Sequence, residues 1–129
     1  MVKVADPLPY VRVYSDAEGE SHFADAELSF TLADFAPPAP RISVSEAMAA
    51  DTVAVISSPA GWHGDWHPAP RRQLMFMLVG ELEVRVSDGQ VRRLSAGDVF
   101  LVEDTVGKGH VSTVVGDVRC FIANVPLTE

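Results

Sequence analysis

Apolar residues alternate with polar ones along most of the second half of the chain. Between residues 81 and 86, three apolar side chains alternate with three charged ones, as in a strand that is buried on one face. Asp88 and Gly89 then supply a tight hairpin turn. Two Gly-Asp turns and one Gly-Lys-Gly turn separate four further predicted strands: Val91–Leu94, Val99–Val102, His110–Val115 and Arg119–Val125. Short strands at such regular spacing predict an antiparallel sandwich or barrel.

The segment Gln73–Val79 is apolar on both faces. Gln73, Met75 and Met77 share one side of a strand, whereas Phe76 points to the other side. A strand that is apolar on both faces needs a cover for its outer face. Either the N-terminal segment or a second subunit can provide that cover, and we expect a homodimer.

The first third of the chain has weaker patterns. It contains three predicted strands, namely Tyr10–Tyr14, Ile42–Ser45 and Thr52–Ser57, with a weakly extended stretch at residues 27–31. Residues 34–41 form an extended proline-rich run, which we expect to lie along the surface of the barrel. We therefore expect a single domain over residues 1–129. Within it, residues 1–49 form N-terminal strands and a wrap, and residues 50–125 form the barrel.

Composition narrows the possible partners and the cellular compartment. The 129 residues include 18 acidic and 10 basic ones, for a net charge of −8, which argues against nucleic acid and anionic membranes as partners. A single cysteine, Cys120, excludes an internal disulfide framework and suits a reducing compartment. The stretch from Thr52 to Gly64 is too short to span a bilayer, and the N-terminus lacks the apolar core of a signal peptide. We expect a cytoplasmic protein.

Histidines provide the candidate chemistry. His63, Asp65 and His67 share one face if their segment is extended, and His110 begins a later strand. Imidazoles and carboxylates that converge inside a barrel are ligands for a divalent metal.

Two motifs that contain these residues resemble the motifs of the cupin superfamily. Cupins are small antiparallel jelly-roll barrels. The first is WHGDWHPAPRRQLMFMLVG at residues 62–80, and the second is GDVFLVEDTVGKGH at residues 97–110. The sequence is most similar to short bacterial single-domain cupins with WHPAPRRQ and EDTxGKGH segments. The resemblance implies an all-β jelly-roll barrel.

The resemblance also implies a site. It assigns His67, Gln73 and His110 as metal ligands, with His63 and Asp65 as rivals for the remaining position. Gln73 stands where cupins usually carry a glutamate, and an uncharged amide would weaken a site for Fe, Mn, Zn or Ni. We expect a divalent metal at most, and no organic cofactor.

Further residues complete the predicted site. Adjacent carboxylates on a strand point in opposite directions, so at most one of Glu103 and Asp104 faces the interior. We assign Glu103 a catalytic role beside His67 and His110, as a general base or as a residue that orients the imidazole, and Asp104 a role in a turn. Met75 and Gln73 would contact the substrate, and Arg71 would attract an anionic one.

Two functions compete at this point. The first is an enzyme that oxidises, isomerises or cyclises a small organic molecule inside the barrel, with or without a metal. The second is a module that binds or senses a small molecule without catalysis. A dimeric barrel with no ligand is a third, structural interpretation.

Overall fold

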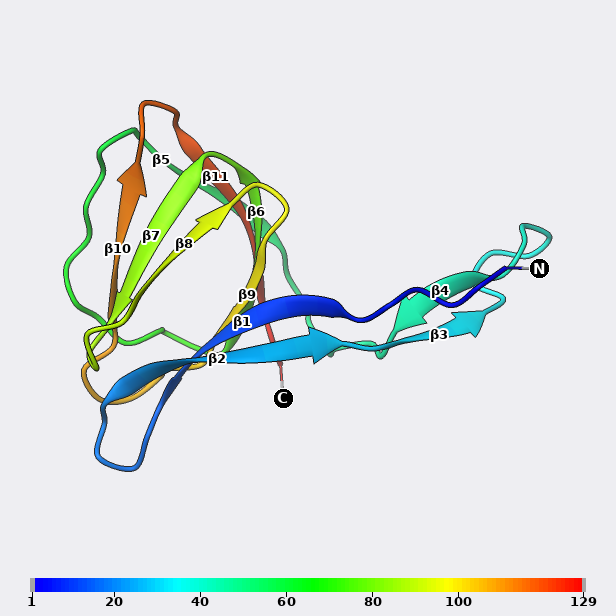
Figure 1. The fold of residues 1–129 in the computed structure, drawn as a ribbon, viewed down its shortest axis with the longest axis horizontal. Helices are drawn as coiled ribbons and strands as arrows, with labels where there is room; N and C mark the ends of the chain where they lie inside the picture. The colour runs from blue at the N-terminus through cyan, green and yellow to red at the C-terminus, as the bar shows by residue number, and fades with distance from the viewer. Residues whose placement is uncertain (1, 129) are drawn as a thin grey trace.

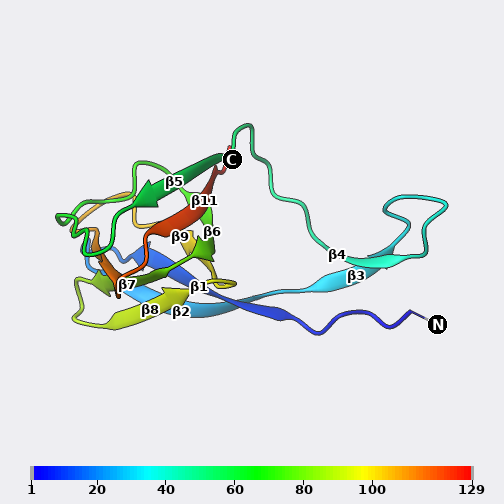
Figure 2. The ribbon, with the colours of Figure 1, turned by 90° about the horizontal axis from the view of Figure 1, so that it is seen from above.

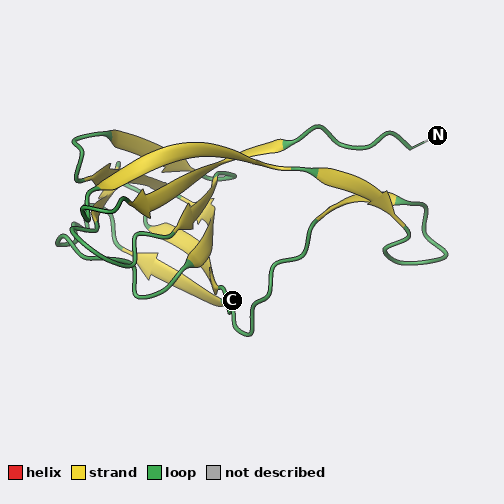
Figure 3. Ribbon diagram, turned by 90° about the horizontal axis from the view of Figure 1, so that it is seen from below, coloured by secondary structure: helices red, strands yellow, loops and turns green. Residues whose placement is uncertain are grey.

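Eleven β-strands form this protein, whose structure is a computed structural model that describes residues 2–128. The described chain has no helix, and so none that could cross a membrane (Figure 3). In spatial order, a six-stranded sheet contains β2 (Ser21–Leu28), β1 (Leu8–Ser15), β9 (Val99–Val102), β6 (Gln73–Val79), β11 (Cys120–Pro126) and β5 (Ala54–Ser58). A three-stranded sheet contains β10 (His110–Val115), β7 (Glu81–Val86) and β8 (Val91–Ser95), and a two-stranded one contains β3 (Phe30–Ala33) and β4 (Ile42–Ser45).

The core lies between the six-stranded and the three-stranded sheets, and we call these two sheets the body (Figure 1). On β7, Leu82, Val84 and Val86 are buried, while the charged residues between them are not. The alternation in the sequence therefore predicted the inner face of β7 correctly. Burial of a side chain of this size contributes roughly 1.5–3 kcal/mol.

The body is all-β, as predicted, but its two sheets are not joined into a closed barrel. Among residues 2–128, hydrogen-bonded strand pairing stays within each sheet. The six-stranded sheet ends at β2 and β5, and the three-stranded sheet ends at β10 and β8. The core between them holds the two sheets together.

Strand β6 is covered only in part on its outer face. Its inner face carries Met75 and Met77, which pack in the core. Its outer face carries Leu74 and Phe76, which belong to a second apolar cluster with Leu101 and other residues. Farther along the same strand, Leu78 is 48% exposed. The expectation that a second subunit covers this face stays a prediction.

The first third of the chain divides into two parts. Strands β1 and β2 belong to the body, because β1 pairs with β2 on one side and runs parallel to β9 on the other. Residues 29–45, which we call the arm, extend away from the body as the hairpin β3–β4 (Figures 1 and 2). The proline-rich run 34–41 connects β3 to β4 at the outer end of the arm. It does not lie along the body surface as expected from the sequence, since β3 and β4 pair with each other.

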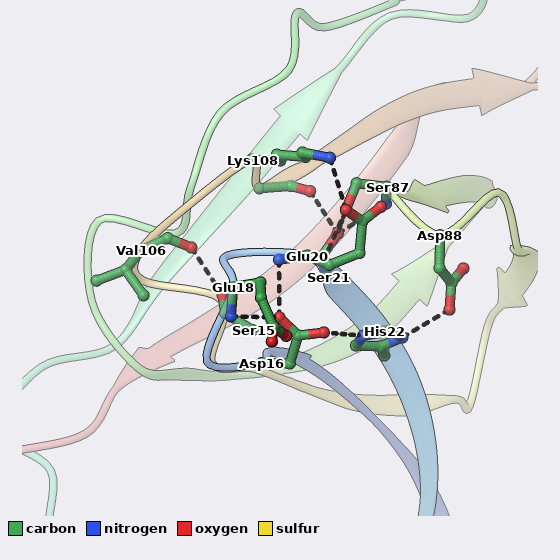
Figure 4. Close-up of polar contacts among 11 residues, drawn as sticks. Ser15, Asp16, Glu18, Glu20, Ser21, His22, Ser87, Asp88, Val106 and Lys108 are labelled. Atoms are coloured by element: carbon green, nitrogen blue, oxygen red, sulfur yellow. Dashed lines mark hydrogen bonds and ion pairs between the residues drawn. The ribbon is translucent and has the colours of Figure 1, made fainter.

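Ionic and hydrogen-bonded contacts join three loops at one end of the body (Figure 4). His22 lies between two carboxylates, with Nε2 2.7 Å from Asp16 Oδ2 and Nδ1 2.8 Å from Asp88 Oδ2. Lys108 Nζ donates to Glu20 Oε2 at 2.6 Å. These contacts connect the β1–β2 turn with the β7–β8 turn and with the loop before β10. The hydrogen bonds to Asp16 and Asp88 raise the pKa of His22.

This raised pKa predicts a pH-dependent contribution to stability. Protonated His22 donates from both ring nitrogens, so its contribution is fully present below the unfolded pKa of about 6.5 and is lost as pH rises through the higher folded pKa. We expect the difference in unfolding free energy between wild type and His22→Gln to shrink as the pH rises from about 6 towards 9. Urea unfolding across this range measures it. A difference that is the same at every pH would contradict the pairing.

Candidate functional site

The candidate site forms where residues 62–67 pair with the free edge of β10. The backbone N–H of His67 donates to the carbonyl of His110 at 3.1 Å, and the N–H of His110 donates back at 3.0 Å. Residues that pair in this way carry their side chains on the same face of the sheet. The two imidazole rings accordingly lie side by side, with their centroids 4.9 Å apart.

Gly109 permits this close pairing. It has a φ of +73°, a conformation that residues with a side chain rarely adopt. A Cβ atom at this position would overlap the backbone carbonyl of His67. The glycine before His110 therefore brings the two histidines together.

A buried carboxylate holds the ring of His110. Asp104 is fully buried, and its Oδ2 atom lies 2.6 Å from Nδ1 of His110. An ionised carboxylate can only accept, so the neutral His110 ring carries its proton on Nδ1. Its Nε2 atom then offers a lone pair. The other Asp104 oxygen, Oδ1, is buried without a partner among the described residues.

The ring of His67 has the same tautomer for a different reason. Its Nδ1 lies 2.8 Å from the backbone carbonyl oxygen of Asp65. A carbonyl oxygen only accepts, so Nδ1 donates and Nε2 is the unprotonated nitrogen of the neutral ring. The site thus presents two imidazole Nε2 atoms that can accept a proton.

Both histidines line a cavity of about 140 Å³ between the two sheets. The rest of the lining is mostly apolar, with a few hydroxyls and one thiol. It includes Val13, Ile56, Ser58, Trp62, Met75, Leu82, Val84, Phe100, Val102, Ser112, Val114, Cys120 and Ile122. Burial raises the pKa of the Cys120 thiol, which therefore stays protonated.

His63 and Asp65 do not join the cavity, contrary to the expectation that they share a face with His67. His63 pairs with Thr113, and its Nδ1 lies 2.6 Å from the hydroxyl of that residue. His63 and His67 are four positions apart in the sequence, but their partners on β10, Thr113 and His110, are only three positions apart. This one-residue shift moves His63 to the opposite face of β10 from His67.

Glu103 does not reach the histidines either. Asp104 occupies the position beside the His110 ring that was predicted for Glu103. The carboxylate of Glu103 lies on the outer face of the six-stranded sheet, 2.7 Å from Arg12 Nε and 2.6 Å from Arg72 Nε. Burial by itself would raise the pKa of Glu103, but the hydrogen bonds from Arg72 and Arg12 outweigh it and lower that pKa.

The expected substrate contacts are distributed over the molecule. Met75 lines the cavity, as predicted for a residue on the inner face of β6. Gln73 is buried on the same strand but does not line the cavity, and Arg71 is exposed away from it.

The residues at the cavity fit a divalent metal only in part. The Nδ1 atoms of His67 and His110 are held by a carbonyl and a carboxylate, as is common for histidines that bind metals. A tightly held ion takes about three or four protein ligands. Within residues 2–128, no third His, Cys, Asp or Glu comes close enough to complete such a set. This donor set is therefore insufficient for a tightly held ion.

Sequence patterns alone could not show which of Asp104 and Glu103 faces the interior. Strand β9 is apolar at all four positions, so its sequence does not indicate which face is inside. The cavity shows that Phe100 and Val102 face inward. Alternation continued from these two residues points Asp104 inward and Glu103 outward.

Several solved structures are similar to this chain. No protein-family model matches the chain, and no curated protein matches it. Similar solved structures include a cupin domain from Bordetella pertussis, with a TM-score of 0.49, 13% identity and coverage of 79% of this chain and 94% of that one. A cupin-2 domain protein from Shewanella frigidimarina has a TM-score of 0.45 and 18% identity over 59% of this chain and 69% of that one.

A third similar structure is the DMSP lyase DddQ from Ruegeria pomeroyi, with a TM-score of 0.49 and 22% identity. The match covers 78% of this chain but only 47% of the lyase. Several of the solved structures that are similar to this chain are cupin-domain proteins.

Substitution of Gly109 tests how the site is assembled. We expect Gly109→Ala to destabilise the protein by more than the roughly 1–2 kcal/mol of left-handed strain, because its Cβ also overlaps His67. Gly116→Ala is the matched control, since Gly116 has a φ of +79° and open space around it. Urea unfolding of both variants gives the comparison. Equal losses would show that the contact with His67 is not tight.

Proposed function

We propose that this chain is a cupin-type jelly roll that binds a small organic molecule between its sheets and moves a proton on it. His110 serves as the general base in this proposal, and Asp104 orients it. The observation that supports the proposal most strongly is the 2.6 Å contact between His110 and the fully buried Asp104 at the cavity.

The size and lining of the cavity suggest the kind of molecule. A volume of about 140 Å³ is close to that of a cavity of about 150 Å³ that binds benzene. Most of the lining is apolar, so it favours a compact hydrocarbon portion. A polar group of the ligand would lie at the two imidazoles, the strongest hydrogen-bonding groups of the cavity.

The tautomer of His110 suits proton abstraction next to a carbonyl group. His110 Nε2 takes a proton from carbon, and the electron pair of the broken C–H bond moves to the carbonyl oxygen. Asp104 favours the resulting imidazolium because its carboxylate faces Nδ1–H. Protonated His67 can donate from Nε2 to the enolate oxygen. Return of the proton to another carbon completes an isomerisation with no change in oxidation state.

Two alternatives keep specific support. A carbonyl and a carboxylate hold the Nδ1 atoms of His67 and His110, an arrangement that suits a weakly held metal, so metal-dependent oxidation or cyclisation stays a prediction. Non-catalytic binding is favoured by the apolar lining, which would hold a ligand without any reaction.

Exchange of carbon-bound hydrogen with deuterium tests the proposal. Cyclopentanone is a suitable probe, because it is a small ring ketone with acidic C–H bonds. We expect the full-length protein in D₂O to accelerate this exchange, and His110→Ala to slow it by about 10²-fold. We also expect a slower rate in Asp104→Asn, since an amide does not stabilise the imidazolium. Proton NMR follows the rate.

His63→Ala is the matched control and should exchange like wild type, because His63 lies on the opposite face of β10. Equal rates in wild type and His110→Ala would exclude proton transfer at this site. If the probe then still shifts the ring signals of His67 and His110, the binding module is the better interpretation. Metal analysis of protein loaded with Fe, Mn, Zn or Ni tests the metal independently.

A further inference from the structure

A second hollow lies on the outer face of the three-stranded sheet, and we call it the outer pocket. Its volume is about 450 Å³, and it is lined by Trp66, Arg85, Val86, Ser87, Gly89 and Lys108. Arg85 stands between Val84 and Val86, whose side chains are buried in the core, so the Arg85 side chain points outward. The outer pocket and the cavity beside the histidines therefore lie on opposite faces of one sheet, and they share no lining residue.

The outer pocket contains one positive charge that no carboxylate neutralises. Arg85 is exposed and forms no ion pair within residues 2–128. Glu83, two residues before it on the same strand, lies 3.7 Å from Arg93 instead. Lys108 is already paired, since it donates to Glu20 at 2.6 Å (Figure 4). None of the described lining residues is acidic, so the pocket favours a ligand with a single negative charge.

Trp66 supplies a flat apolar surface beside this charge. Its side chain is 47% exposed, and within the described part of the chain no aromatic ring or guanidinium stacks on it. The backbone pairing of His67 with β10 fixes the position of Trp66 at the edge of the sheet. An exposed indole that is held in this way can stack with a second aromatic ring.

A flat aromatic carboxylate satisfies both features of the pocket at once. A guanidinium binds a carboxylate through two parallel N–H···O hydrogen bonds. We propose that the outer pocket binds an aromatic monocarboxylate, with its carboxylate on Arg85 and its ring on Trp66. The pocket is larger than a cavity of about 150 Å³ that holds one benzene ring, so it favours two fused rings. A phosphate monoester suits it less, because its second negative charge would lie near Glu20.

The segments that line the outer pocket also place the two histidines. Trp66 directly precedes His67, and Lys108 lies two residues before His110. On β7, Val86 is the pairing partner of His110. A ligand in the outer pocket would thus contact these segments from the side opposite the imidazoles. Binding there requires neither the inner cavity nor proton transfer, so this inference does not depend on the proposed function.

NMR of the tryptophan indole N–H groups tests the proposal, because the chain has only two tryptophans. Trp66 lines the outer pocket and Trp62 lines the inner cavity, so the two signals report on the two sites separately. The variant Trp66→Leu removes one signal and thereby assigns both. We expect 2-naphthoate to shift the Trp66 signal of the full-length protein until it saturates, and to leave the Trp62 signal in place.

Changes in ligand charge test the role assigned to the guanidinium. The neutral isostere 2-naphthamide should bind about tenfold more weakly than 2-naphthoate, because it cannot form the charged pair with Arg85. The dianion 2-naphthyl phosphate should also bind more weakly than 2-naphthoate. Equal affinity for the acid and the amide, or tighter binding of the phosphate, would overturn the proposal.

Two arginine variants complete the test. Arg85→Gln should weaken binding of 2-naphthoate by about tenfold. Arg119→Gln is the matched control, since it removes the same charge from an exposed arginine that donates to Ser57 and does not line the pocket. It should bind like wild type. Equal losses in the two variants, a shift of the Trp62 signal alone, or no shift of either signal would overturn the proposal.

Discussion

The apolar layer between the two sheets decides which side chains of this protein face each other. Val13, Val84, Val86 and Val114 are almost completely buried in it, so each of their strands has one fixed inner face. On β10 the inner face also includes His110, and on β9 it extends to Asp104. The acid and the base of the candidate site thus meet because they continue the inner faces of strands whose orientation the core determines.

The pair formed by Asp104 and His110 is the costly part of this arrangement. A buried carboxylate without a partner is strongly unfavourable, and the imidazole removes most of that penalty. One carboxylate oxygen still lacks a partner among the described residues. Apolar pairs of similar size are often as favourable for stability as buried polar pairs, so the needs of the core alone do not account for Asp104 and His110.

Different forces act on the outer face of the six-stranded sheet. Near β1 and β9, Glu103 is held between Arg12 and Arg72, which makes that part of the face polar. Towards β5 the same face carries exposed apolar side chains, among them Val55 and Phe121, and Phe35 and Ile42 of the arm are exposed as well. The inner face therefore carries the candidate chemistry, whereas the outer face carries ionic contacts and exposed apolar side chains.

The sequence by itself determined the all-β architecture, most strands and the motifs that bring His67 and His110 together, because alternation and turn residues act over short distances. It missed most of β2, where polar and small residues interrupt the apolar pattern. Only the tertiary structure decided that His63 and Glu103 lie outside the cavity and that Asp104 lies inside it. A one-residue shift in strand pairing and the inner face of an entirely apolar strand depend on contacts between segments far apart in the chain. The direction of the arm depends on such contacts too, since its local pattern predicts strands but not what they rest on.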